Sequence, residues 1–436
     1  MKKRALVIIG IAAACLVVII LYFVYLNVFV NKHRLKLEHA QLGGSEYRNT
    51  AAESSIMPSY MWRRVNSILI EDGYLMSDYM LEGRLADQDA VPSGKYLLQD
   101  QALLLLKYLA ESDRSSSIDL VKKVNADFAN GDGSYRGTVF KDGTEDLSYT
   151  NTDELCWLEA YLEFYSAYGS GNDLENIGNL TGIVFDSNGV MKPEELHSTT
   201  YVSSENVSGE VTDEDLDPSF ETVYGAEDVT VAEGTNSEED FKFSGVKISD
   251  MDLELIFNLE QNGLIPAGTY DRYSGIVTGA LVSPSIPYYA YAYATDGNGN
   301  SDYVYSCSRA ATISVGESLI TMVHLAERGL LPEGVYNEFK SSLINDSILK
   351  SNYYLATGLT GGSEITSGYQ DALQLARLKQ DTDLYRTICR IMSVRVATNK
   401  QSRALYLIFI NENNRYVFYS HENIKTYLIV NGMFAV

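Results

Sequence analysis

Apolar residues that recur every three or four positions are the feature that most constrains the fold of this chain. Such segments follow one another from residue 57 onward, separated by loops that contain Gly, Asn or Asp. Besides one helix within 148–169, they predict helices over 59–70, 97–109, 118–128, 248–259, 310–328, 334–343, 366–378, 383–394 and 422–430. This count, with little predicted strand, indicates an all-α toroid of helical hairpins whose inner ring presents its loops on one face. A solenoid is the alternative, but the sequence has no fixed repeat period.

The segment 148–169 carries the most informative local pattern. Thr150 or Thr152 can cap a helix, and Asp153 and Glu154 then fall in its first turn. Carboxylates are favoured there by unpaired amide hydrogens and by the helix dipole. Two interpretations follow: an ordinary capped core helix, or the mouth of a carbohydrate-cleaving centre.

The amino terminus predicts a membrane anchor. Three basic residues at 2–4 precede 26 uncharged residues at 5–30, enough for about 39 Å of helix. Because no small-residue cleavage site follows before Lys32, we expect an uncleaved, single-pass anchor with a cytoplasmic tail and an extracellular body. The predicted organisation is tail and transmembrane anchor at 1–31, a polar stalk at 32–55, and one helical domain at 56–436.

Charge and composition exclude several classes of protein. The formal net charge is −24 and the pI is about 4.6, so we expect no nucleic-acid partner. Residues 183–245 show little of the apolar periodicity of a helix and are rich in Asp, Glu, Ser and Thr, which indicates a solvated acidic insertion. The four cysteines and five histidines are scattered and no Gly-rich phosphate loop is present, so we expect no metal and no cofactor.

Tyrosines gather between residues 270 and 305, and Tyr288 and Tyr289 belong to this group. Aromatic rings stack on the apolar faces of sugars, so the segment is typical of a saccharide groove. Tyrosines packed at the surface of a hairpin are an equally ordinary interpretation.

Four segments, taken in order, carry a resemblance to a known family. They are 99–106 (QDQALLLL), 152–157 (TDELCW), 316–327 (GESLITMVHLAE) and 423–428 (NIKTYL). Their order and spacing resemble family 8 glycoside hydrolases and the membrane-anchored relatives of that family, over about residues 57–430. The resemblance implies an (α/α)6 toroid with a carboxylate-lined cleft that acts on polysaccharides.

The same resemblance implies site residues and shows two departures. Segment 99–106 is similar to the helix whose Ser-Glu-x-Gln-Gly start supplies the family's general acid, and here Gln99 occupies the position of the acid, with Asp100 next to it. Segment 152–157 is similar to the helix that holds the sugar at the point of cleavage. Segment 305–309 is similar in outline to the segment of the catalytic base, with Ser306 in place of Asp.

The predicted function is therefore a membrane-anchored extracellular glycoside hydrolase acting on a polysaccharide such as an exopolysaccharide. Such chemistry needs one protonated carboxyl group and one ionised one. The candidate catalytic residues are Asp100, Asp153, Glu154 and Glu317, and the candidate substrate-binding residues are Gln99, Trp157, Tyr288 and Tyr289. The alternative is a catalytically degenerate glycan-binding or polysaccharide-export accessory protein.

Overall fold

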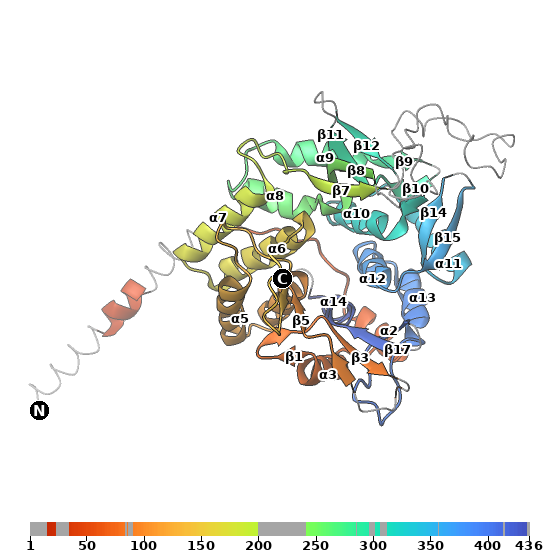
Figure 1. Cartoon of the computed structure of the whole chain (residues 1–436), viewed down its shortest axis with the longest axis horizontal. Helices are drawn as coiled ribbons and strands as arrows, with labels where there is room; N and C mark the ends of the chain where they lie inside the picture. Colours follow the sequence, from red (N-terminus) through yellow and green to blue (C-terminus); the bar gives the residue numbers. More distant parts are fainter. Residues whose placement is uncertain are drawn as a thin grey trace, which may run out of the picture.

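Helices arranged in a closed ring form the body of the protein (Figure 1). The computed structural model describes residues 15–22, 35–82, 85, 90–198, 241–284, 286–295, 301–305, 312–355, 357–412 and 415–433. Within these ranges the inner helices are α4 (Leu98–Ala110), α6 (Asn151–Tyr168), α8 (Leu253–Gln261), α10 (Val315–Glu327), α12 (Gly368–Leu378) and α14 (Ser420–Asn431). Helix α4 contacts α6, α8 contacts α10, α10 contacts α12, and α12 contacts α14, which returns to contact α4. The short helix η5 (Ile248–Asp250) contacts both α6 and α10.

A second set of helices packs outside this ring. It consists of α2 (Glu46–Glu53), α3 (Pro58–Ile68), α5 (Arg114–Asp127), α7 (Gly171–Val184), α9 (Thr269–Gly279), α11 (Glu333–Asp346) and α13 (Thr382–Ser393). For example, α5 packs on α4, α7 on α6, α9 on α8 and α13 on α12. Because an outer helix carries the chain back between successive inner helices, the inner helices begin on the same side of the ring. The predicted helical toroid is confirmed, although α7 and α9 were not predicted.

The expectation of an all-α fold with little strand is wrong, because short antiparallel hairpins fill the loops between helices. The two-stranded pairs are β1 (Ile70–Glu71) with β2 (Tyr74–Leu75), β5 (Lys95–Leu97) with β6 (Thr138–Phe140), and β9 (Leu281–Ser283) with β10 (Ile286–Tyr289). A three-stranded sheet has the order β13 (Thr312–Ser314), β14 (Lys350–Tyr354), β15 (Leu359–Glu364).

Two four-stranded sheets complete the strand content of the described residues. One has the order β16 (Ile410–Glu412), β17 (Arg415–Tyr419), β3 (Asp78–Glu82), β4 (Ala90–Pro92). The other has the order β12 (Ser301–Val304), β11 (Ala292–Thr295), β8 (Phe241–Lys247), β7 (Glu194–Ser198). Strands β5, β8, β13 and β17 run directly into α4, η5, α10 and α14, so these strands fix where the inner helices begin.

The core lies between the two sets of helices. On α6 the predicted apolar face is buried: Leu155, Leu158, Tyr161 and Leu162 are each 5% exposed or less. Burying one such leucine contributes about 1.5–3 kcal/mol, so this face holds α6 firmly against its neighbours. Helix α4, whose sequence is rich in leucine, is buried almost all round.

The predicted polar stalk is wrong for residues 35–55. Residues 35–42, called the strap below, run in extended form along α8, and α2 then buries Tyr47 in the core. Within the strap, Lys36 N donates to Asn262 Oδ1 at 2.9 Å and Glu38 N donates to Asn258 Oδ1 at 2.8 Å. Because polar side chains of α8 satisfy the backbone of the strap, a polar sequence can pack against the domain instead of standing free.

Several predicted features lie wholly or largely outside the described residues. In the predicted anchor only residues 15–22 are described, and they form a helix whose apolar side chains are exposed. No helix of the described part of the chain is long and apolar enough to span a bilayer. The acidic insertion is described only at its edges, up to residue 198 and from 241, and Ser306 is not described.

Candidate active site

Side chains at the beginnings of α4, α6, η5 and α10 join into one polar arc. Gln99 Nε2 donates to Asp153 Oδ1 at 2.9 Å, and Thr152 Oγ1 donates to Asp250 Oδ1 at 2.7 Å. Ser249 Oγ, beside Asp250, donates to Glu317 Oε2. We call the three carboxyl groups of Asp153, Asp250 and Glu317 the carboxylate arc. Two of these acids, Asp153 and Glu317, were predicted from the sequence, and Asp250 was not.

Asp153 is held in place by the helix that it begins. Thr150 caps α6: Asp153 N donates to Thr150 Oγ1 at 3.2 Å, and Asp153 Oδ2 accepts from Thr150 N at 3.0 Å. This reciprocal capping box confirms the interpretation of a capped helix. Since the other carboxylate oxygen is turned toward Gln99, the cap also fixes the orientation of Asp153 in the arc.

Asp250 is the carboxyl group best suited to donate a proton. It is 5% exposed, and burial raises its pKa to about 7 against the opposing effects of Lys247 and the Thr152 hydroxyl. Its Oδ2 atom is buried without a hydrogen-bond partner among the described residues. A carboxyl group that keeps its proton near neutral pH is what a general acid requires.

Two lysines place positive charge beside the carboxyl groups of the ring. The pKa of Lys247 is raised, because Asp250 and Glu317 together with Glu194 outweigh the opposing effect of burial. On the other side of the ring, Lys425 Nζ pairs with Asp371 Oδ1 at 2.6 Å. Neither lysine was predicted from the sequence: Lys425 meets Asp371 only through the closure of the ring, whereas Lys247 lies three residues before Asp250.

Glu154 does not join the arc. It is fully buried, and its Oε1 accepts from Tyr135 N at 2.7 Å, so it supports the loop before α6. Burial raises its pKa to about 8. Successive residues on a helix differ by about 100° in direction, which explains why Asp153 reaches the arc and Glu154 does not.

Asp100 is also separated from the arc. It is 1% exposed, lies between α4 and α14, and is 3.6 Å from His421 Nδ1. Burial raises its pKa. The side chain that α4 presents to the arc is therefore the amide of Gln99, which is half-buried and carries no acidic proton.

The predicted sugar-stacking residues are buried, which is a correction to their predicted placement. Trp157, Tyr288 and Tyr289 are 0%, 2% and 1% exposed. Trp157 packs against Tyr161 at a ring distance of 5.6 Å, and Tyr288 packs against Tyr353 at 4.8 Å. Their rings complete the core between helices, so they leave no face open to a sugar.

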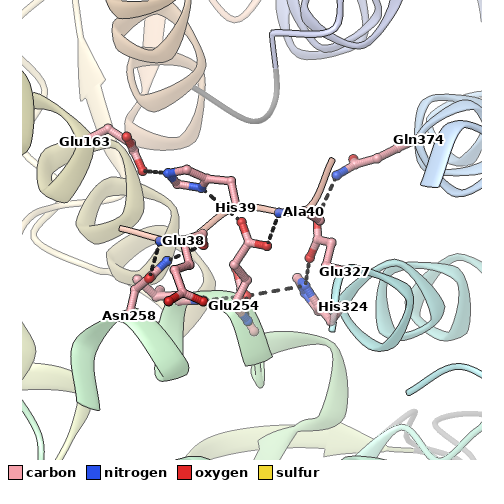
Figure 2. Close-up of polar contacts among 11 residues, drawn as sticks. Glu38, His39, Ala40, Glu163, Glu254, Asn258, His324, Glu327 and Gln374 are labelled. Carbon is pink, nitrogen blue, oxygen red and sulfur yellow. Dashed lines mark hydrogen bonds and ion pairs between the residues drawn. The ribbon is translucent and has the colours of Figure 1, made fainter. Parts of the chain in front are cut away.

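A second polar cluster lies deeper in the ring, where the strap meets α6 and α8 (Figure 2). His39 Nε2 is 3.1 Å from Glu163 Oε1, and His39 Nδ1 is 3.1 Å from Glu254 Oε1. These two carboxylates raise the pKa of His39 to about 10 despite its burial. The strap therefore inserts a cation between two acids of the inner ring.

Comparison with known proteins supports the fold. No family profile matches the sequence, and no curated protein matches it either. Among solved structures, an alpha-amylase from Clostridium perfringens has 14% identity and a TM-score of 0.62, over 87% of this chain and 98% of that one. A beta-1,3-1,4-glucanase from Paenibacillus sp. X4 has 11% identity and a TM-score of 0.51, over 92% and 97%.

A third similar structure is a reducing-end-xylose releasing exo-oligoxylanase, with 10% identity and a TM-score of 0.51, over 88% of this chain and 94% of that one. The similarity spans nearly the whole length of all three proteins. The TM-scores establish a shared fold, and at identities this low they establish the fold alone, so the toroid that the sequence resemblance implies is confirmed.

Proposed function

We propose that this protein is a glycoside hydrolase that cleaves a polysaccharide at the carboxylate arc. The observation that carries the proposal is the placement of Asp153, Asp250 and Glu317 at the beginnings of α6, η5 and α10, each hydrogen-bonded to a side chain of a neighbouring element. One of the three side chains is buried and two are half-buried. A glycosidase needs carboxyl groups of different character facing one substrate, and the arc supplies them.

In the proposed reaction Asp250 is the general acid. Its proton passes to the glycosidic oxygen as the bond to the anomeric carbon breaks. Glu317 accepts a proton from the water that attacks this carbon, and Asp153 binds the sugar with Gln99. The nearby Lys247 limits how far the pKa of Asp250 rises, which keeps the group able to give up its proton.

Hydrolysis of a panel of exopolysaccharides, β-glucans and xylans tests the proposal. Asp250→Asn and Glu317→Gln should each lower turnover by about 100-fold or more, the usual size of a general acid–base contribution. Asp119→Asn makes the same chemical change at an exposed position on α5 and should leave turnover unchanged. A panel left uncut, or cleavage that survives Asp250→Asn, would refute the assignment.

A catalytically degenerate glycan-binding or polysaccharide-export accessory protein is the second candidate. It is favoured by Gln99, because an amide stands where the resemblance places the general acid. This candidate predicts oligosaccharide binding without turnover, and an affinity that Asp153→Asn leaves unchanged. Turnover that is lost in Asp153→Asn would exclude it.

We also propose that the protein is tethered to the cell membrane with its body outside the cell, where polysaccharides are found. The proposal depends on the uncharged run at 5–30 behind Lys2, Lys3 and Arg4. Protease added to intact cells should digest the body, and deletion of residues 5–30 should release the protein from the membrane fraction. A body that only cell lysis exposes to protease would contradict this orientation.

A further inference from the structure

One ring nitrogen of His324 faces two carboxylates from different parts of the chain. His324 Nδ1 is 3.7 Å from Asp252 Oδ1 and 3.5 Å from Glu327 Oε2. The Nδ1 atom is shielded from solvent and makes no hydrogen bond within the described residues. The three ligand-type atoms lie within 4.8 Å of one another. They are one nitrogen and two oxygens, which are atoms that metal ions bind.

We propose that Asp252, His324 and Glu327 bind a divalent transition-metal ion of the zinc class. Two ligand atoms about 2.0 Å from a tetrahedral zinc ion lie about 3.3 Å apart, close to the spacings found here. The same spacings are long for direct hydrogen bonds. One imidazole and two carboxylates favour Zn²⁺ over Mg²⁺ or Ca²⁺, which prefer oxygen ligands alone.

The surrounding groups hold each ligand in the orientation that metal binding requires. His324 Nε2 lies 3.1 Å from Ser249 O, and since a carbonyl oxygen only accepts, Nε2 carries a proton and Nδ1 is the nitrogen left to bind an ion. Gln374 Nε2 donates to Glu327 Oε1 at 2.9 Å, leaving Oε2 toward the histidine (Figure 2). These contacts are the usual second layer of a metal site.

Asp252 is fixed independently by the helix that it caps. Its Oδ1 accepts from Glu254 N and from Leu255 N, both at 2.9 Å, at the beginning of α8. All three ligand side chains are 14–17% exposed, so an ion can reach them from solvent.

The charges around the site also favour a cation. Glu159 of α6 interacts with Asp252, Glu327, Glu254 and Glu163, and its pKa is raised by burial and by these acids. His39 places one positive charge between Glu163 and Glu254 on the strap side. A divalent ion between Asp252 and Glu327 would offset the two negative charges that face His324.

The proposed ion would brace the segment that carries Asp250. His324 is held by the carbonyl of Ser249, whose hydroxyl contacts Glu317 in the carboxylate arc. A metal that fixes His324 therefore also fixes η5 behind the arc. The role is structural, and it does not depend on whether the arc cleaves sugar.

Zinc binding to the 436-residue chain after chelator treatment tests the proposal. The wild type should bind about one Zn²⁺ per chain, and zinc should raise the midpoint of thermal unfolding. His324→Ala and Glu327→Gln should each weaken binding by more than about 10-fold, with Mg²⁺ binding far weaker than Zn²⁺ in the wild type. Binding should release a proton and weaken as pH falls, because the ion displaces a proton from His324.

Glu327→Gln keeps the size of the side chain and its contact with Gln374, so it separates loss of a ligand from loss of the fold. His421→Gln, which removes a histidine beside Asp100, is the matched control and should leave zinc binding unchanged. The absence of zinc binding by the wild type, or equal binding by all three variants, would overturn the proposal. His324 would then be a protonated partner of the two carboxylates.

Discussion

Replacing His39 by glutamine removes the charge that the strap inserts between Glu163 and Glu254. A pKa raised from 6.5 to about 10 corresponds to about 5 kcal/mol of preferential stabilisation of the imidazolium. At pH 7 about 4 kcal/mol of this is available, because the unfolded histidine is then partly neutral. Losing one partner of a buried ion pair costs about 3–5 kcal/mol, which agrees with this value. We therefore expect His39→Gln to lower the free energy of unfolding by about 4 kcal/mol at pH 7.

The loss should depend on pH in a defined direction. Since the folded-state pKa is raised, the contribution of His39 is fully present below pH 6.5 and is lost as pH rises through about 10. The difference between wild type and variant should fall to about 1 kcal/mol at pH 9. Urea unfolding at pH 6, 7, 8 and 9, followed by circular dichroism and by tryptophan fluorescence, measures this difference.

Lys36→Gln is the matched control, because it also removes a basic side chain from the strap but at an exposed position. Its effect should stay within about 0.5 kcal/mol at every pH. A His39→Gln effect below about 1 kcal/mol at pH 7, or one that is constant from pH 6 to pH 9, would show that the strap is not held by the charge of His39.

Three further changes test the site and its support. Gln99→Glu should bring two carboxylates into contact and lower the free energy of unfolding by about 1 kcal/mol at pH 8 but not at pH 4. Adding Asp153→Asn should remove this loss of stability. A loss of the same size at both pH values would contradict the prediction. Thr150→Ala should lower the free energy of unfolding by about 1 kcal/mol and Thr150→Ser by much less, as measured with urea. Trp157→Phe should reduce stability yet leave oligosaccharide affinity unchanged in calorimetry, whereas a large loss of affinity would return Trp157 to the sugar site.

The helices could be predicted because the residues that specify a helix lie within one short segment of the chain. Thr150, Asp153 and the apolar positions of α6 lie within one segment, so periodicity and a capping pattern were enough to place this helix. The short strands were missed for the opposite reason. Pairs such as Tyr79 with Phe418 join residues far apart in the chain, and no local pattern specifies such a partner.

The candidate site was only half predictable. Asp153 is marked by its position in the first turn of a predicted helix and Glu317 by the resemblance of segment 316–327, but Asp250 was assigned to a helix over 248–259 and was not singled out. In the structure it precedes α8, where Asp252 provides the cap. The run Ser249 to Asp252 contains two aspartates before the apolar positions, a signal for a helix beginning that could have identified the site.

The strap also constrains how the protein is made. Its backbone binds Asn262, which lies 226 residues further on, and Arg377 reaches back 334 residues to the carbonyl of Gly43. At about 5–20 residues per second, a ribosome needs roughly 15–70 seconds to deliver the second of these partners. Until α8 has been synthesised the strap has no helix to dock on, and the ring closes only when nearly all of the chain is present.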